Sequence, residues 1–369
     1  MQPPTIEAAL RDVNSAKPRF RRDAAEALGR ADGDDTARAR DALGRLLGDA
    51  DRSVRVAAAE SLGAVGDDSD LDALVRLADD SDEAVRIAAV EAAASVAADP
   101  DAALIRLADH ASPDVRITAC IELRASSEEA AAEALLRRLR DGDARVRAAV
   151  VASLCAALPS RHAGAVRAML SDDDPDVRLA AACGLASARD DSGRNLLLDR
   201  VPRRPRDDTW RAALPALARV AHPDDAPVLR RFAGWLPPRG IRAVALAGLA
   251  RLGDAAAEAR LRRMAGHRDP RRRASALLGA GVAGLESFLP EIERDLREPR
   301  SALFDVALHA LVELRTPAAA RTLVAVAREL KTAGKDGEGV AEYFADAAAA
   351  MARSLGDDAP AELIDLAKC

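Results

Sequence analysis

The sequence predicts an all-α protein, an α-solenoid in which antiparallel helix pairs stack into a superhelical array. Three observations lead to this fold class. A Val-Arg motif returns at a nearly constant interval, an acidic turn precedes most copies, and each copy continues into apolar residues spaced as on one face of a helix. Aromatic residues make up only 2% of the 369 residues, while alanine is abundant. We therefore expect a core built by close approach of small-faced helices.

The arginine of the motif recurs at a period near 31 residues, with gaps of 34, 31, 30, 31, 31, 33, 31 and 31. The nine copies are Arg21, Arg55, Arg86, Arg116, Arg147, Arg178, Arg211, Arg242 and Arg273. A tenth copy at 301–314 keeps the apolar pattern but has Phe304 at the arginine position, and an eleventh falls around 340–355. We predict ten to eleven units in a single continuous array over 1–369, with clear repeats in 1–330 and a less regular C-terminal capping unit in 331–369.

Each unit is predicted to contain two helices joined by an acidic turn. In the segment 71–80 (LDALVRLADD), apolar residues recur three and four positions apart, as on one face of a first helix. Val54, Ala58, Leu62 and Val65 give a second helix the same kind of face. Aspartate is a favoured N-cap, and it stands four residues before the arginine in most units. These aspartates are Asp51, Asp82, Asp143, Asp174, Asp207 and Asp269.

The caps place each arginine close to the start of its second helix. A cation there faces the positive end of the helix dipole, which is unfavourable by about 0.3–1 kcal/mol. Each arginine therefore needs a partner, and the acids in the turn of a neighbouring unit are the natural candidates. We expect an Asp–Arg ladder that ties layer to layer, formed by Arg55, Arg86, Arg116, Arg147 and Arg178 with Asp51, Asp82, Asp143 and Asp174.

The shared core of the units is D-x-x-V-R-x-A-A-x-x-L, as in 51–62 and 174–185. This core resembles the HEAT-repeat family, specifically the short bacterial HEAT-like repeats also called phycobilisome-lyase-type repeats. The resemblance covers roughly 5–330. It implies a solenoid with an extended interaction surface, and it does not select one function because such repeats serve many unrelated roles.

Residues that could carry catalysis or hold a metal are scattered. Cys120, Cys155, Cys183 and Cys369 are far apart, with no CxxC pair. The five histidines form no metal-binding pair, and His110 and His267 occupy matching turn positions. No nucleophile motif or phosphate-binding glycine loop is present, and no carboxylate pair stands out for acid–base work. We predict a protein that is not an enzyme and needs no metal or cofactor.

Three features favour a bacterial cytoplasmic protein. Only four lysines accompany 50 arginines, which we interpret as the coding bias of a bacterial genome rich in GC. The start, MQPPTIEAALRDV, has no basic region followed by an apolar core, so no signal peptide is expected. No run of 18 apolar residues is present to span a membrane, and the dispersed cysteines suit a reducing compartment.

Charge is distributed unevenly along the chain, whose net charge is −6. Residues 1–190 carry 25 basic and 35 acidic side chains, 191–300 carry 22 and 14, and 301–369 carry 7 and 11. The basic region also holds both tryptophans, of which Trp210 occupies the valine position of the repeat and is expected in the core. Equivalent turns of three consecutive units there are basic, so they could form a stripe about 20 Å long at ~10 Å per layer. The predicted partner-binding residues are Arg203, Arg204, Arg206, Trp235, Arg239 and Arg271.

The function favoured by these features is a non-enzymatic scaffold or adaptor, a monomer that binds a protein partner with an acidic contact segment. A nucleic-acid-binding alternative exists, because HEAT-like repeats also form DNA glycosylases with Trp, Asp and Arg around a basic groove. The acidic first half and the shortage of aromatic stacking residues speak against it. A second alternative, implied only by the resemblance, is a helper for phycobilin attachment of the lyase type.

Overall fold

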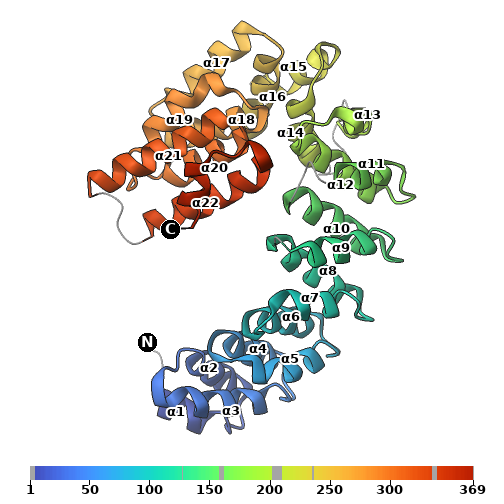
Figure 1. Ribbon diagram of the computed structural model, residues 1–369, viewed down its shortest axis with the longest axis vertical. Coiled ribbons are helices and arrows are strands. Elements are labelled where there is room, and N and C mark those ends of the chain that lie inside the picture. Colours follow the sequence, from blue (N-terminus) through green and yellow to red (C-terminus); the bar gives the residue numbers. More distant parts are fainter. Residues whose placement is uncertain are drawn as a thin grey trace. The chain divides into compact units, whose positions relative to one another are not determined.

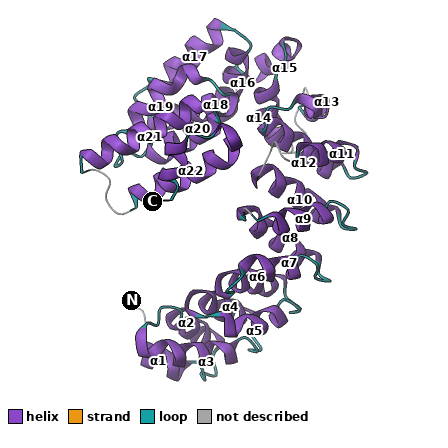
Figure 2. Ribbon diagram, in the orientation of Figure 1, coloured by secondary structure: helices purple, strands orange, loops and turns teal. Residues whose placement is uncertain are grey.

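The computed structural model describes residues 5–126, 128–157, 162–201, 210–234, 237–334 and 339–368. Within these residues the chain is α-helical, with short 3-10 turns and no strand (Figures 1 and 2). The predicted α-solenoid of helix pairs is confirmed. No helix in the described part of the chain is both long and apolar enough to cross a bilayer.

First and second helices alternate along the chain. The first helices are α1 (Ile6–Asp12), α3 (Thr36–Leu46), α5 (Leu71–Leu77), α7 (Pro100–Leu107), α9 (Glu129–Arg138), α11 (Ala163–Ala168), α13 (Arg194–Arg200), α15 (Ala226–Phe232), α17 (Ala255–Ala265), α19 (Leu289–Leu296) and α21 (Pro317–Thr332). The second helices are α2 (Pro18–Leu28), α4 (Arg52–Val65), α6 (Glu83–Val96), α8 (Pro113–Glu122), α10 (Ala144–Ala157), α12 (Pro175–Ser187), α14 (Trp210–Val220), α16 (Arg239–Arg251), α18 (Pro270–Ala283), α20 (Phe304–Leu314) and α22 (Val340–Leu355), followed by a last short helix, α23 (Ala361–Leu366). All nine repeated arginines lie in second helices.

The chain folds into two compact units, 1–154 and 155–369. In the first unit, successive second helices from α2 to α8 pack against one another, and first helices such as α3, α5 and α7 pack beside them. In the second unit, α12, α14, α16, α18 and α20 form the same kind of series. Each unit is thus a stack in which every layer completes the core of the next. That the whole chain forms a single array stays a prediction.

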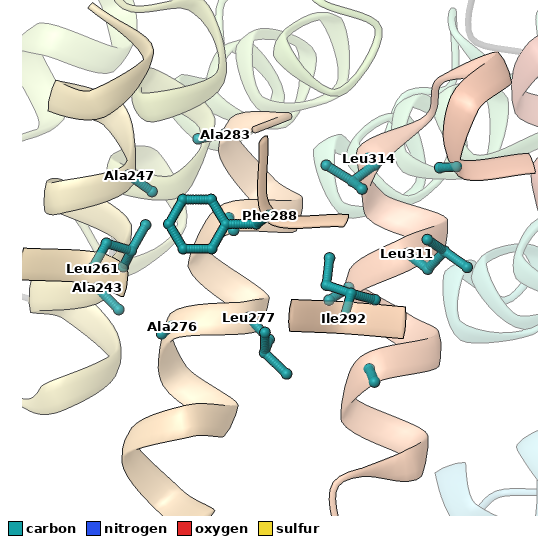
Figure 3. Close-up of a cluster of buried hydrophobic side chains, with 14 of the residues drawn as sticks. Ala243, Ala247, Leu261, Ala276, Leu277, Ala283, Phe288, Ile292, Leu311 and Leu314 are labelled. Carbon is teal, nitrogen blue, oxygen red and sulfur yellow. The ribbon is translucent and has the colours of Figure 1, made fainter. Parts of the chain in front are cut away.

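Small residues let the second helices approach closely. A Cβ atom at Gly281 of α18 would lie 2.5 Å from the carbonyl oxygen of Ala310 in α20, so only glycine fits at this crossing. Larger side chains enter from the first helices and from the turns before them. Phe288 is completely buried among side chains of α16, α17 and α18, including Ala247 and Leu261 (Figure 3). The expected core of small-faced helices is therefore supplemented by a few large apolar side chains.

Candidate partner-binding surface

Several of the repeated arginines bind carboxylates of the following layer. Arg55 donates from Nε and Nη2 to Asp80 at 2.8 and 2.9 Å, and Arg116 donates to Asp141 at 2.9 and 2.7 Å. Arg21 makes the same bidentate pair with Asp49. Its hydrogen bond is the largest influence on Asp49 and holds the pKa of that carboxyl below its usual value.

Each of these arginines also holds the turn that precedes its own helix. The Nη1 atom donates to the backbone carbonyl oxygen six residues earlier, at 2.8 Å from Arg55 to Asp49 and at 2.9 Å from Arg86 to Asp80. Arg147 and Arg178 make the equivalent bonds at 2.9 and 2.6 Å. These guanidinium groups are engaged within the chain, so they have little capacity left for an external partner.

The capping aspartates and the arginine partners are different residues of the same turn. Asp51, Asp82, Asp143 and Asp174 accept from backbone N–H groups in the first turn of their helices, at 2.8–3.0 Å. The carboxylates that receive the arginines stand two residues before three of these caps, at Asp49, Asp80 and Asp141.

One layer departs from this rule because His110 replaces the aspartate. Its Nδ1 accepts from Ser112 N at 3.1 Å, and Arg86 pairs instead with Asp114 at 2.7 Å. In its own turn, the Nδ1 atom of His267 accepts in the same way from Asp269 N at 2.9 Å. The interpretation of these two histidines as turn residues is confirmed.

Two residues of the predicted basic stripe lie in the described part of the chain. Arg239 begins α16, is exposed, and pairs with Asp269 at 3.1 Å. Asp269 also caps α18 by accepting from the backbone N–H of Arg271 at 3.0 Å, so one carboxylate links the starts of α16 and α18. The stripe residues Arg203, Arg204, Arg206 and Trp235 lie outside the described residues, as does the predicted cap Asp207.

Several exposed arginines near these two have no carboxylate partner. Among the described residues, no ion pair is formed by Arg263, Arg268 or Arg271, all three of which are exposed. The other tryptophan of this region, Trp210, is 8% exposed and stacks on Phe232 with ring centroids 5.4 Å apart. Its predicted place in the core is confirmed.

A second basic group in the unit 155–369 was missed by sequence reasoning. The charges of Arg219, Arg251 and Arg315 all act on Arg189, although these arginines are up to 126 positions apart, and Glu313 is the carboxylate beside them. A signal for two of them was present in the repeat. Gly253 and Gly284 lie one or two residues beyond the ends of α16 and α18 and have positive φ angles, and Arg189 and Arg315 stand at multiples of 31–32 residues from them.

Neither a metal site nor a catalytic constellation stands out in the described residues. They contain no group of three histidine, cysteine or acidic side chains placed to hold a metal ion. A mainly apolar pocket of about 250 Å³ lies between α21, α22 and α23, with Phe344 on its wall and Lys331 and Glu362 beside it. Its lining contains no histidine, cysteine or serine.

Comparison with known proteins supports the repeat assignment. A family profile described as HEAT repeats matches residues 3–94 and 76–155. A search of curated proteins gave no match.

Similar solved structures include YibA of Escherichia coli, at 19% identity over 66% of this chain and 92% of YibA, with a TM-score of 0.48. A mutant of Kap121p is 15% identical over 96% of this chain and 46% of that chain, with a TM-score of 0.41. Human deoxyhypusine hydroxylase in complex with glycerol is 23% identical over 59% of this chain and 84% of that chain, with a TM-score of 0.29. These similarities are too distant to transfer an activity or a partner.

Proposed function

We propose that this chain, which belongs to the HEAT-repeat proteins, is a non-enzymatic scaffold or adaptor that binds an acidic segment of a partner protein through its basic stripe. The observation that carries the proposal is the group of exposed arginines near the start of α18 (Arg263, Arg268 and Arg271) that form no ion pair among the described residues. The proposal also places the chain in a bacterial cytoplasm, as a monomer.

Charge and side-chain type both favour an acidic partner. Residues 191–300 hold 22 basic and 14 acidic side chains, whereas the rest of the chain is acidic. A guanidinium group can receive a carboxylate through two parallel hydrogen bonds, and arginine is enriched at interface hot spots. Because Arg268 and Arg271 are exposed and unpaired, a partner carboxylate would displace only water from them. Arg239 would either bind the partner's carboxylate while it keeps its ion pair with Asp269, or exchange Asp269 for that carboxylate.

The test compares two variants with the same change in net charge. In the first, the five stripe arginines become glutamate (Arg203, Arg204, Arg206, Arg239 and Arg271). In the control, five exposed arginines of the unit 1–154 become glutamate (Arg30, Arg76, Arg106, Arg137 and Arg140), none of which forms an ion pair in the described residues. Each variant and the wild type capture proteins from a nuclease-treated bacterial lysate, and bound proteins are quantified by mass spectrometry.

We expect a protein with an acidic segment that binds the wild type and the control and is lost from the stripe variant. Binding of that segment, made as a peptide, should weaken as salt rises because exposed charges are screened. If both charge-reversed variants lost the captured protein equally, the effect would come from the change in net charge, and a localised stripe would be refuted. Capture that depends on intact nucleic acid would instead support the nucleic-acid-binding alternative.

A further inference from the structure

The second basic group lies where the carboxyl ends of several second helices of the unit 155–369 come together. Arg189 follows α12 and donates from Nη1 to the carbonyl oxygen of Ala283, the last residue of α18, at 3.3 Å. Arg315 follows α20 and donates to the carbonyl oxygen of Ser187, the last residue of α12, at 3.1 Å. The ends of α12, α18 and α20 are therefore joined by two guanidinium groups.

Two more arginines and one carboxylate complete this group, which we call the helix-end cluster: Arg189, Arg219, Arg251, Arg315 and Glu313. Arg219 of α14 forms an ion pair with Glu313 of α20, and their side chains are 15% and 18% exposed. Arg251, the last residue of α16, is exposed. Four positive charges thus face one negative charge, which leaves a surplus of three.

Burial and the surplus charge both act on the pKa of Arg189. Burial is the largest influence on Arg189, and the charges of Arg251, Arg219 and Arg315 add to it, so its pKa falls to about 10. Burial likewise lowers the pKa of Arg315. The partial negative charge at helix carboxyl ends offsets only part of this repulsion, since it amounts to roughly half a charge per helix.

The backbone also departs from the repeat at this place. Arg189 and Arg315 have φ angles of +60° and +50°, and they are the only non-glycine residues with positive φ in the described chain. Equivalent positions after α16 and α18 hold glycine, Gly253 and Gly284, with φ of +86° and +69°. A residue with a side chain is about 1 kcal/mol less stable there than glycine. Such local strain concentrates at binding sites.

Among the described residues, Arg189 and Arg315 each donate one N–H to a backbone carbonyl, which leaves their other N–H donors for a ligand. A ligand that neutralises the surplus needs more than one negative charge and several acceptor oxygens. A carboxylate offers one charge and two oxygens in a plane, whereas a phosphate group offers close to two charges and three oxygens that point in different directions. Arginine forks match that geometry.

We infer that the helix-end cluster binds a phosphate group, free or carried by a small metabolite. Arg251 at the exposed edge of the cluster receives it, and Arg189, Arg219 and Arg315 surround its oxygens. Glu313 opposes binding by its charge while it positions Arg219. This site is separate from the basic stripe and does not depend on the function proposed above.

The test is calorimetric titration of the full chain with inorganic phosphate and, in a second arm, with glycerol phosphate, at constant ionic strength. Acetate serves as the carboxylate control. Arg251→Gln removes a charge that makes no hydrogen bond in the described structure, so the fold should be kept. We expect it to weaken phosphate binding at least about tenfold, the effect of losing one charge-assisted hydrogen bond. Arg353→Gln, at an exposed and unpaired arginine of α22, is the matched control and should bind as the wild type does.

The direction in which Glu313→Gln changes the phosphate affinity decides between a binding site and a purely structural cluster. The amide keeps an acceptor for Arg219 but removes the opposing charge, so phosphate should bind more tightly, whereas a purely structural cluster would gain nothing. Far-ultraviolet circular dichroism checks that each variant is folded. Binding of the ester alone would assign the site to a phosphorylated metabolite. Failure of both phosphate compounds to bind the wild type, equal binding by all variants, or an equal response to acetate would overturn the inference.

Discussion

The Arg116–Asp141 pair is the strongest test of the Asp–Arg ladder. Their side chains are 13% and 3% exposed, and two nitrogens of Arg116 contact the two carboxylate oxygens at 2.9 and 2.7 Å. Asp141→Asn keeps an acceptor oxygen for the backbone N–H of Asp143, now 2.9 Å away, but it removes the charge and replaces the oxygen that accepts from Arg116 Nε by an NH2 group that cannot accept. Removing one partner of a fully buried pair costs about 3–5 kcal/mol. Because this pair lies at the edge of the layer, we expect about 2–3 kcal/mol.

The matched control is the Arg52–Asp82 pair two repeats earlier, in which Arg52 is 71% exposed. Arg52→Gln should change stability by less than about 1 kcal/mol. Thermal unfolding followed by circular dichroism should therefore separate the two variants. For a unit of this size, 2–3 kcal/mol corresponds to about 4–12 °C. Equal midpoints for Asp141→Asn and Arg52→Gln would refute the claim that buried ladder pairs hold the layers.

The same pair predicts a dependence on pH. Burial acts to raise the pKa of Asp141, but the hydrogen bonds from Arg116 and from the Asp143 N–H outweigh it, so the pKa is lowered. The pair's contribution is therefore complete above the unfolded carboxyl's pKa of about 3.9 and is lost as pH falls toward the folded value. The difference between wild type and Asp141→Asn should be constant near neutral pH and shrink in acid. A difference that grows on acidification would contradict this assignment.

Three further outcomes follow from the packing and titration of single residues. Gly281→Ala should destabilise the fold by about 1–3 kcal/mol, because the added Cβ meets the carbonyl oxygen of Ala310. Gly44→Ala, in an open helical position, should stabilise the fold by about 0.5–1 kcal/mol. Thermal unfolding measures both changes. The Cys120 thiol, whose pKa burial raises to about 12, should resist alkylation in the folded chain and react after unfolding, as peptide mass spectrometry would show. Burial, with the charges of glutamates in the two flanking repeats, raises the pKa of Glu91, so its ionised form destabilises the fold. Glu91→Gln should therefore raise the unfolding temperature at neutral pH. The gain should disappear below pH of about 4, where Glu91 is protonated in both the folded and the unfolded chain.

The period of the sequence was sufficient to predict the helix pairs, the caps and the position of each ladder arginine. It did not identify the arginine's partner, because each acidic turn holds two aspartates with different tasks. Asp82 caps its own helix, while Asp80 receives Arg55 of the preceding layer. Only the stacking of layers decides between them. The helix-end cluster was missed for a related reason, since its members meet through the packing of α12, α14, α16, α18 and α20 rather than through adjacency in the repeat.

The ladder also gives a physical reason for arginine at the repeated position. Arg116 donates to both oxygens of Asp141 and to the carbonyl oxygens of His110 and Ala111, so a single side chain ties two turns through four hydrogen bonds. A lysine ammonium has three donors on one nitrogen and cannot make a planar bidentate pair while reaching a separate turn. The preference of this sequence for arginine over lysine therefore coincides with a geometric requirement at the ladder positions. Among the described residues, Arg268 and Arg271 form no ion pair, unlike the ladder arginines. By this difference we distinguish arginines that hold the fold from those that we propose bind a ligand.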